Sequence, residues 1–528
     1  MPLIGYQRQT GSKAHFSASK SHPQMALGCH TKRVVDIELD DRLKEECGVL
    51  GVYTQPHEGE HQDAARIGFF GLFALQHRGQ ESAGIAVSDG TRVRLRRGMG
   101  LVNQVFDEAA LDDLPGHIAV GHTRYSTTGA SELRNAQPVF CQSQIGDIAI
   151  AHNGNLINAR ELRAEMEQDG DRFDSTSDSE IIARIIVKNM HLGPEAAVAE
   201  VMRRARGAYS VTVLTPKVLI GFRDPTGIRP LVVGTLGDDG YLIASETCAF
   251  HPVGGVPLQE LEPGEMVIID AHGMRLACGA KSTRKAMCLF EFIYFARPDS
   301  VMYGTSLYTA REKMGAQLAK EHPVEADIVV PVPDSGIPAA LGYSVESGIP
   351  YREGMVKSRY IHRTFISPNQ RMRELGVKMK LTALENHLVG KRVILVDDSI
   401  VRGTTTKQIV KLMFDSGATE VHVRITAPPI KFPCFYGIDM ADKSELAAAK
   451  MTIKQLEEDL GATSLGYLSI QGAIDAVGKG KDNFCLACFN GDYPVPVPDN
   501  LRKDTLDKPT HVGEIAAISH GQLKLIEM

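Results

Sequence analysis

One stretch decides the fold of the C-terminal half, and it reads Val393-Ile394-Leu395-Val396-Asp397-Asp398-Ser399-Ile400-Val401-Arg402-Gly403-Thr404-Thr405. Its four leading apolar residues predict a buried strand that ends in two carboxylates, Asp397 and Asp398. Ligands bind at that end of the strands in open α/β sheets. The following loop leads into a helix predicted over 405–416, and the start of such a helix can hold a phosphate. The pattern therefore predicts a sugar-phosphate site, whose carboxylates suit ribose hydroxyls and Mg²⁺.

The sequence around this stretch predicts the rest of a sheet. Apolar runs at 327–331 and 421–426 read as strands, and the order strand, loop, helix, strand indicates a parallel α/β sheet. A second loop, Pro331-Val332-Pro333-Asp334-Ser335-Gly336, follows the first of these strands. Between the two loops lies Lys357-Ser358-Arg359-Tyr360-Ile361-His362-Arg363-Thr364, whose three cations suit a pyrophosphate group.

These strings resemble the type I phosphoribosyltransferases. The resemblance implies phosphoribosyl pyrophosphate as substrate and makes the segment that begins at Lys357 a flexible loop that closes over it. It also implies Mg²⁺, held by Ser335, Asp397 and Asp398. The residues that it assigns to phosphoribosyl pyrophosphate are Lys357, Asp397, Asp398, Ser399, Val401, Arg402, Gly403, Thr404 and Thr405.

The N-terminal half has a different pattern. From Cys47 to about Leu276, short apolar runs alternate with Gly, Asp and Asn turns and read as strands. Helices are predicted over 64–76 and 177–190, so a strand-rich sandwich with covering helices is expected. Since the pattern changes near Gly279, we predict a leader at 1–46, domains at 47–279 and 280–495, and a tail at 496–528.

Four strings in this half resemble the class II glutamine amidotransferases, which are N-terminal-nucleophile hydrolases with an αββα sandwich. They surround Cys47 and lie at His122–Thr127, His152–Leu156 and Ser177–Glu180. A fifth string, Gln76–Gly84, matches the same family, and we interpret its residues as architectural and site-shaping.

The resemblance assigns a role to each residue of the glutaminase site. Cleavage before Cys47 would free an α-amino group that serves as base for the thiol, since such an amine titrates near ~8. The oxyanion of the tetrahedral intermediate needs preorganised donors, which are the Asn153 side chain and the Gly154 backbone N–H. Arg124 would bind the carboxylate of glutamine, and Asp178 its ammonium group.

Both halves in one chain resemble the amidophosphoribosyltransferase family, over about Glu45 to Val495. That family makes 5-phosphoribosylamine from glutamine and phosphoribosyl pyrophosphate, releases glutamate and pyrophosphate, and begins de novo purine synthesis. The resemblance implies homotetramers, feedback by purine nucleotides and an apolar ammonia channel. Two alternatives stay open. Another class II amidotransferase would leave the Asp397–Asp398 loop unexplained, and a non-enzymatic regulator would not need Cys47.

The nine cysteines do not form the dense, even pattern of a secreted disulfide scaffold. Cys485 and Cys488 form a C-x-x-C pair, and Cys288 and Cys434 stand in strings like those of an iron–sulfur subgroup of the family. The resemblance therefore implies a [4Fe–4S] cluster on these four residues, although zinc accepts the same ligands. Cys248 is a rival for the place of Cys288.

Bulk properties exclude some other classes. The chain has 528 residues and a net charge of −6, which argues against a nucleic-acid partner. No apolar run approaches the ~18 residues of a membrane span. Residues 1–33 contain no Asp or Glu and no secretory apolar region, so a propeptide or a transit peptide is expected. The expected location is the cytoplasm, or a plastid if the leader is a transit peptide.

Overall fold

The structure is a computed structural model that describes residues 47–55, 63–125, 131–142, 146–238, 240–282, 284–358, 381–440 and 442–498. These residues belong to one compact unit. The predicted leader with its cleavage point, the tail beyond residue 498 and the predicted flexible loop beyond residue 358 lie outside the described residues.

The first half contains a seven-stranded sheet in the order β11-β9-β10-β1-β4-β2-β3. Every neighbouring pair is antiparallel. The central strand β1 pairs with β4 so that Gly48 lies opposite Thr123. The strands are β1 (Gly48–Tyr53), β2 (Ser82–Ser88), β3 (Val93–Met99), β4 (Ile118–Arg124), β9 (Val232–Leu236), β10 (Gly240–Ala244) and β11 (Gly255–Glu260).

A second, six-stranded antiparallel sheet has the order β13-β12-β8-β7-β6-β5. Its strands are β5 (Val139–Cys141), β6 (Ile148–Leu156), β7 (Gly207–Leu214), β8 (Leu219–Arg223), β12 (Glu265–Asp270) and β13 (Gly273–Cys278). Apolar side chains of both sheets, such as Val49, Val120 and Ala151, form one buried cluster, so the sheets pack face to face.

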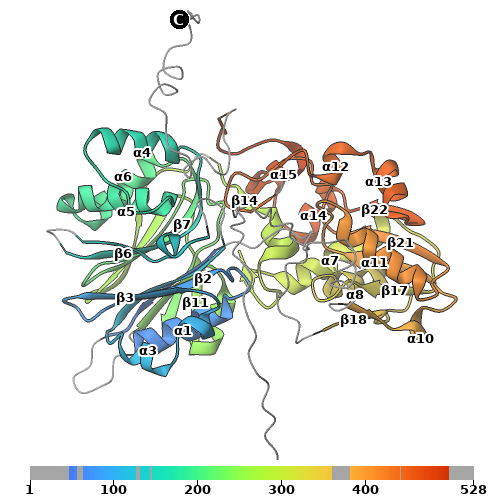
Figure 1. Cartoon of the computed structure of the whole chain (residues 1–528), viewed down its shortest axis with the longest axis horizontal. Coiled ribbons are helices and arrows are strands. Elements are labelled where there is room, and N and C mark those ends of the chain that lie inside the picture. The colour runs from blue at the N-terminus through green and yellow to red at the C-terminus, as the bar shows by residue number, and fades with distance from the viewer. Residues whose placement is uncertain are drawn as a thin grey trace, which may run out of the picture. The chain divides into compact units, whose positions relative to one another are not determined.

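Helices cover the outer faces of the two sheets (Figure 1). On the seven-stranded sheet lie α1 (Ala64–Ala74), α2 (Val102–Val105) and α3 (Glu108–Asp112), and on the six-stranded sheet lie α4 (Ala159–Gln168), α5 (Asp178–Asn189) and α6 (Pro194–Arg204). Helix α5 buries Ile181, Ile182, Ile185 and Ile186, as its periodicity predicts. The half is thus the αββα sandwich of an N-terminal-nucleophile hydrolase, as predicted.

The second half contains a four-stranded parallel sheet in the order β17-β20-β21-β22. Its strands are β17 (Ile328–Pro331), β20 (Arg392–Asp397), β21 (Glu420–Ile425) and β22 (Ser464–Tyr467). Its longer helices are α7 (Leu307–Glu321), α8 (Ile337–Ser347), α11 (Thr404–Asp415), α13 (Ile453–Leu460) and α14 (Ile470–Val477). The predicted α/β fold and its first three strands are confirmed, whereas β22 was not predicted.

Short elements complete the second half. They are β14 (Met287–Cys288), a π-helix η5 (Glu291–Phe295), β15 (Val301–Met302), β16 (Thr305–Ser306), β18 (Met355–Lys357), β19 (Leu381–Ala383), α10 (Glu385–Leu388), α12 (Ala447–Lys450), β23 (Phe484–Cys485) and α15 (Ala487–Asn490). The apolar core of this half also takes in Ile157, Ala208 and Ile228 of the first half. In the described part of the chain, no helix is long and apolar enough to cross a membrane.

Candidate active sites

Cys47 lies immediately before β1, the central strand of the seven-stranded sheet. Its side chain is buried, and its Sγ donates a hydrogen bond to the Tyr125 carbonyl at 3.4 Å. Burial raises the pKa of the thiol to about 11, while the nearby Arg124 charge lowers the pKa and Asp178 raises it. Cys47 therefore lies within the electrostatic field of both residues predicted to bind glutamine, and it needs a base to become a thiolate.

Arg124 and Asp178 are brought to this region by two different elements. Arg124 is the last residue of β4 and is buried, with one guanidinium nitrogen 3.8 Å from Glu81 Oε2. Asp178 is the first residue of α5, and its Oδ2 accepts a hydrogen bond from the Leu156 N–H at 2.9 Å. That bond fastens the start of α5 to the end of β6.

Asn153 and Gly154 lie on β6. The Asn153 side chain is fully buried, and within the described residues neither its Oδ1 nor its Nδ2 has a hydrogen-bond partner. A buried amide without partners costs about 1–3 kcal/mol, so it is unusual outside a binding site. Gly154 has φ +141°, and a Cβ there would lie 2.0 Å from the Ala208 carbonyl oxygen. Only glycine fits at that position.

Two buried histidines link the two sheets beside these residues. His122 on β4 donates through Nε2 to the carbonyl of His152 on β6, at 3.0 Å. Burial lowers the pKa of His122 to about 3 and also lowers the pKa of His152, so both rings are neutral at pH 7. Gln137 holds the same backbone, since its Oε1 accepts from the His152 N–H at 2.8 Å. The sequence strings that contain His122 and His152 give neither histidine a role, and Gln137 has no distinctive sequence neighbourhood that would identify it.

Three residues predicted to bind phosphoribosyl pyrophosphate or Mg²⁺ form hydrogen bonds with Asp398. Asp397 and Asp398 are buried where β20 ends, and the Asp398 N–H donates to Asp397 Oδ1 at 2.9 Å. The hydroxyls of Ser335 and Ser399 donate to the two carboxylate oxygens of Asp398. The structure thus brings together the two loops that follow β17 and β20, which are neighbouring parallel strands.

The rest of the loop leads into α11. Gly403 precedes the helix with φ +87°, a conformation that favours glycine, and α11 begins at Thr404, with Thr405 in its first turn. The Val401 carbonyl accepts a hydrogen bond from the Ala447 N–H at 2.8 Å. Arg402 donates to Glu445 Oε2 through two nitrogens, at 2.9 and 2.7 Å. Lys357, on β18, donates to Asp334 Oδ2 at 2.8 Å, and so lies against the Pro331–Gly336 loop.

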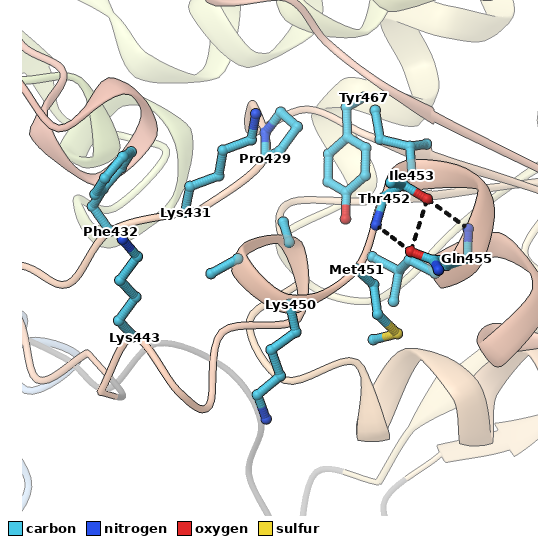
Figure 2. Close-up of a pocket in the computed structure, with 13 residues that line it drawn as sticks. Pro429, Lys431, Phe432, Lys443, Lys450, Met451, Thr452, Ile453, Gln455 and Tyr467 are labelled. Carbon is cyan, nitrogen blue, oxygen red and sulfur yellow. Dashed lines mark hydrogen bonds between the residues drawn. The ribbon is translucent and has the colours of Figure 1, made fainter.

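A pocket of about 450 Å³ lies next to this loop, on the segment that Ala447 ties to Val401 (Figure 2). Three lysines line it, and no lining residue is acidic. One of them, Lys443, has its Nζ 4.9 Å from the centre of the Phe432 ring. None of the residues predicted to bind either substrate lines this pocket, so it is separate from both candidate sites.

The four candidate cluster cysteines lie near one another. Cys288 and Cys485 are register partners in the parallel pair of β14 and β23, and the Cys488 carbonyl accepts hydrogen bonds from the N–H groups of Lys431 and Phe432. Burial raises the pKa of the Cys288 and Cys485 thiols to about 12, and the Cys434 thiol raises both further.

No metal-binding arrangement is formed by these cysteines as they stand. The structure describes eight cysteines, and all of them are free. Across the described ranges, no group of three or more His, Cys, Asp or Glu side chains is arranged to hold a metal ion. The rival residue Cys248 lies against Glu246, with its Sγ 3.7 Å from Glu246 Oε2.

Comparison with known proteins gives the family. Residues 122–252 match the model of a glutamine amidotransferase domain. The amidophosphoribosyltransferase of Synechococcus elongatus is 49% identical over 475 residues, which are 89% of this chain and 95% of that protein. The chloroplastic amidophosphoribosyltransferase 1 of Arabidopsis thaliana is 44% identical over 459 residues, or 87% of this chain and 80% of that protein.

A solved structure gives the same result. It is that of glutamine phosphoribosylpyrophosphate amidotransferase from B. subtilis complexed with ADP and GMP, and it matches with a TM-score of 0.81 at 43% identity. The match covers 86% of this chain and 99% of that chain, so it includes both halves. The chain therefore belongs to the amidophosphoribosyltransferase family, whose enzymes use glutamine to aminate phosphoribosyl pyrophosphate at the first step of purine synthesis.

Proposed function

We propose that glutamine is hydrolysed at Cys47 and that the ammonia is used at the Asp397–Asp398 loop. The observation that carries the first assignment is the buried Asn153 amide, which lacks partners among the described residues although it lies on the strand that His122 joins to β4. A buried carboxamide whose N–H group has no other described partner can donate a hydrogen bond to an oxyanion. The second assignment is supported by the gathering of Ser335 and Ser399 on Asp398.

The glutaminase step follows from the chemistry of a buried thiol. A free α-amino group of Cys47 takes the thiol proton, and the thiolate attacks the amide carbon of glutamine. The Asn153 Nδ2–H and the Gly154 N–H stabilise the oxyanion. The α-ammonium group returns its proton to the amide nitrogen, and the intermediate collapses to a thioester and releases ammonia. Water then hydrolyses the thioester to glutamate. Arg124 binds the substrate carboxylate and Asp178 the ammonium group, so that the amide alone reaches Cys47.

At the second site, Asp397 and Asp398 bind the ribose hydroxyls, and the N–H groups of residues 399–405 hold the 5′-phosphate. Ser335, Asp397 and Asp398 offer only oxygen atoms, a set that fits Mg²⁺. A bound Mg²⁺ would neutralise charge on the pyrophosphate leaving group. Lys357, which already bonds to the Pro331–Gly336 loop, contacts the same group, and ammonia attacks C1 of the ribose as pyrophosphate leaves.

For Cys288, Cys434, Cys485 and Cys488 we propose a [4Fe–4S] cluster, with zinc as the alternative. The donor set supports a thiophilic group, because the four thiols are neighbours. Such a group would clamp residues 485–488 onto β14. Anaerobically purified protein should contain about four irons and four sulfides per chain. Active protein that carries stoichiometric zinc would decide for zinc, and active protein without metal would leave ordinary buried cysteines.

Three further proposals concern partners and location. We propose inhibition by purine nucleotides, which is supported by the bound ADP and GMP of the B. subtilis relative. We also propose a homotetramer, which sedimentation of the purified enzyme would test. The proposed location is the cytoplasm. The chloroplastic relative supports a plastid as the alternative, and cell fractionation separates the two.

The mature N-terminus tests the proposed mechanism. Intact-mass measurement of the active enzyme should give a chain that begins at Cys47, because the proposed base exists only when that amine is free. A fully active enzyme that begins upstream of Cys47 would overturn the mechanism.

A further inference from the structure

Arg78 is a buried arginine that bonds to both halves of the chain. It lies after α1, and its Nε donates to the Cys47 carbonyl at 3.1 Å. Its two terminal nitrogens donate to Glu291 at 3.1 and 2.8 Å, and one of them also donates to Glu246 at 2.6 Å. Arg78 is 1% exposed, and Glu246 and Glu291 are 0% exposed. Arg78 thus connects the backbone of Cys47, the proposed nucleophile, to two buried carboxylates.

The two carboxylates come from different places. Glu246 belongs to the first half and is held there by His77, whose Nε2 lies 2.7 Å from Glu246 Oε1. Glu291 belongs to the second half, where it opens the π-helix η5. Its fork-on-fork pairing with Arg78 is directional, so a shift of Glu291 would move the guanidinium.

The π-helix is in turn held by the second half. Arg311, a buried residue of α7, donates to the Phe292 carbonyl at 2.9 Å and to the Ala296 carbonyl at 2.6 Å. Single-turn π-helices are uncommon and frequently occur at functional sites. A chain of contacts therefore runs from α7 through η5 and Glu291 to Arg78 and the Cys47 carbonyl.

We propose that Glu291 is a positioning residue for the glutaminase: it holds Arg78 against the Cys47 carbonyl from the phosphoribosyl half. This inference rests on the proposed role of Cys47 as nucleophile. The first half then cannot place Cys47 correctly by itself, since Glu291, one of the described anions that orient Arg78, is supplied by the second half. Glutamine cleavage then depends on the position of η5, whereas use of added ammonia does not.

Glu291→Gln tests the proposal, because it keeps the size of the side chain and removes its charge. The expected result is a loss of about 10- to 100-fold in kcat/KM for glutamine, the size of effect that a small displacement of a reacting group causes. Ammonia-dependent synthesis should stay within about twofold, because none of the described contacts of Arg78 involves a residue of that site. A merely structural role would lower both routes in parallel, and that result would overturn the proposal, as would no change in either route.

Glu260→Gln is the matched control. Glu260 is a largely buried carboxylate of the first half that also joins the two halves, since it accepts a hydrogen bond from the Tyr303 N–H, but none of its described contacts involves Cys47 or Arg78. Its variant should keep the ratio of the glutamine route to the ammonia route. If that ratio changed equally in both variants, weakening any contact between the two halves would reduce the glutamine route selectively. That result would overturn the specific role of Glu291.

Arg78→Lys covers the case in which Glu291→Gln does not fold. A lysine keeps a charge for Glu246 and Glu291 but has no Nε to donate to the Cys47 carbonyl, so the same selective loss is expected. Cys47→Ala separates this inference from the proposed function. If that variant kept the glutamine route, the nucleophile assignment would be wrong. If it lost the route while Glu291→Gln and Arg78→Lys kept it, only the positioning role would be wrong.

Discussion

The glutaminase site and the phosphoribosyl site are built in opposite ways. The first draws Cys47, Arg124, Asn153 and Asp178 from four separate parts of the chain, and all four side chains are buried. The second comes mainly from one loop between β20 and α11, and its cations are open to solvent, with Lys357 49% and Arg402 38% exposed. A buried site can keep polar groups unpaired until a small neutral amide arrives, whereas an open cationic loop suits a highly charged phosphate that must enter and leave.

The largest effect expected on both nitrogen routes together is at the acidic pair of the open site. Asp397→Asn or Asp398→Asn should lower glutamine- and ammonia-dependent synthesis alike, on the order of 10³-fold, because several kcal/mol of charge stabilisation are lost. Basal glutamine hydrolysis should persist. The measurement is phosphoribosylamine formation with each nitrogen source. Unchanged ammonia-dependent activity in both variants would mean that the loop is not the shared site.

The next effect concerns the buried site alone. Asn153→Ala should lower glutaminase kcat by about 10²–10³-fold, the usual result of removing an oxyanion donor. Stability should change by less than about 1 kcal/mol, because the lost contacts are offset by removing two polar atoms that have no partner among the described residues. Parallel glutaminase assays and thermal unfolding give the two numbers. A large loss of stability with little loss of kcat would make Asn153 a structural residue.

A third effect is the pH dependence of Cys47. In the uncut chain, burial raises the pKa of this thiol from 9.0 to about 11, so ~100-fold less thiolate is present at pH 7. Because the pKa is raised, alkylation of Cys47 by iodoacetamide should still increase above pH 9. In the cut enzyme the α-amine takes the proton, and the rate should level off above about pH 8. The two Cys47 peptides differ in mass, so one sample reports both profiles. Identical profiles would remove the amine from the mechanism.

The smallest effect is expected at the exposed cations. Lys357→Ala or Arg402→Ala should raise KM for phosphoribosyl pyrophosphate about tenfold, since an exposed charge contributes on the order of 1 kcal/mol. The effect should weaken as salt is added. Lys411→Ala, a more exposed lysine on α11 that pairs with Asp415, is the control and should leave KM unchanged. A change of kcat without a change of KM would contradict a binding role.

The contrast between the buried site and the open site also explains how much of each could be predicted from the sequence. The sequence predicts the open site in detail, because the strand, the loop and the start of the helix lie within thirteen consecutive residues and local patterns describe them. The residues of the glutaminase site stand in separate strings of the sequence, and only the family resemblance assigns them to one site. Their meeting depends on the register of Gly48 with Thr123 and on the bond between His122 and His152, which no local pattern encodes.

Other elements escaped prediction for physical reasons. Strand β3 is a half-exposed edge strand with three arginines, so its alternation is weak. The π-helix η5 is apolar and aromatic apart from Glu291, and such a composition does not distinguish it from a strand or an α-helix. The role proposed for Glu291 depends on its contact with Arg78, which lies 213 residues away in the sequence.

Cys47→Ala, assayed with glutamine and with ammonia, tests directly whether the two reactions occur at separate sites. The variant lacks the nucleophile of the buried site and leaves the open loop untouched. We expect glutamine-dependent synthesis to fall by at least ~10⁴-fold, while ammonia-dependent synthesis stays within about twofold of the unaltered enzyme. Equal loss of both routes, or retention of the glutamine route, would contradict the division of the chemistry between two separate sites.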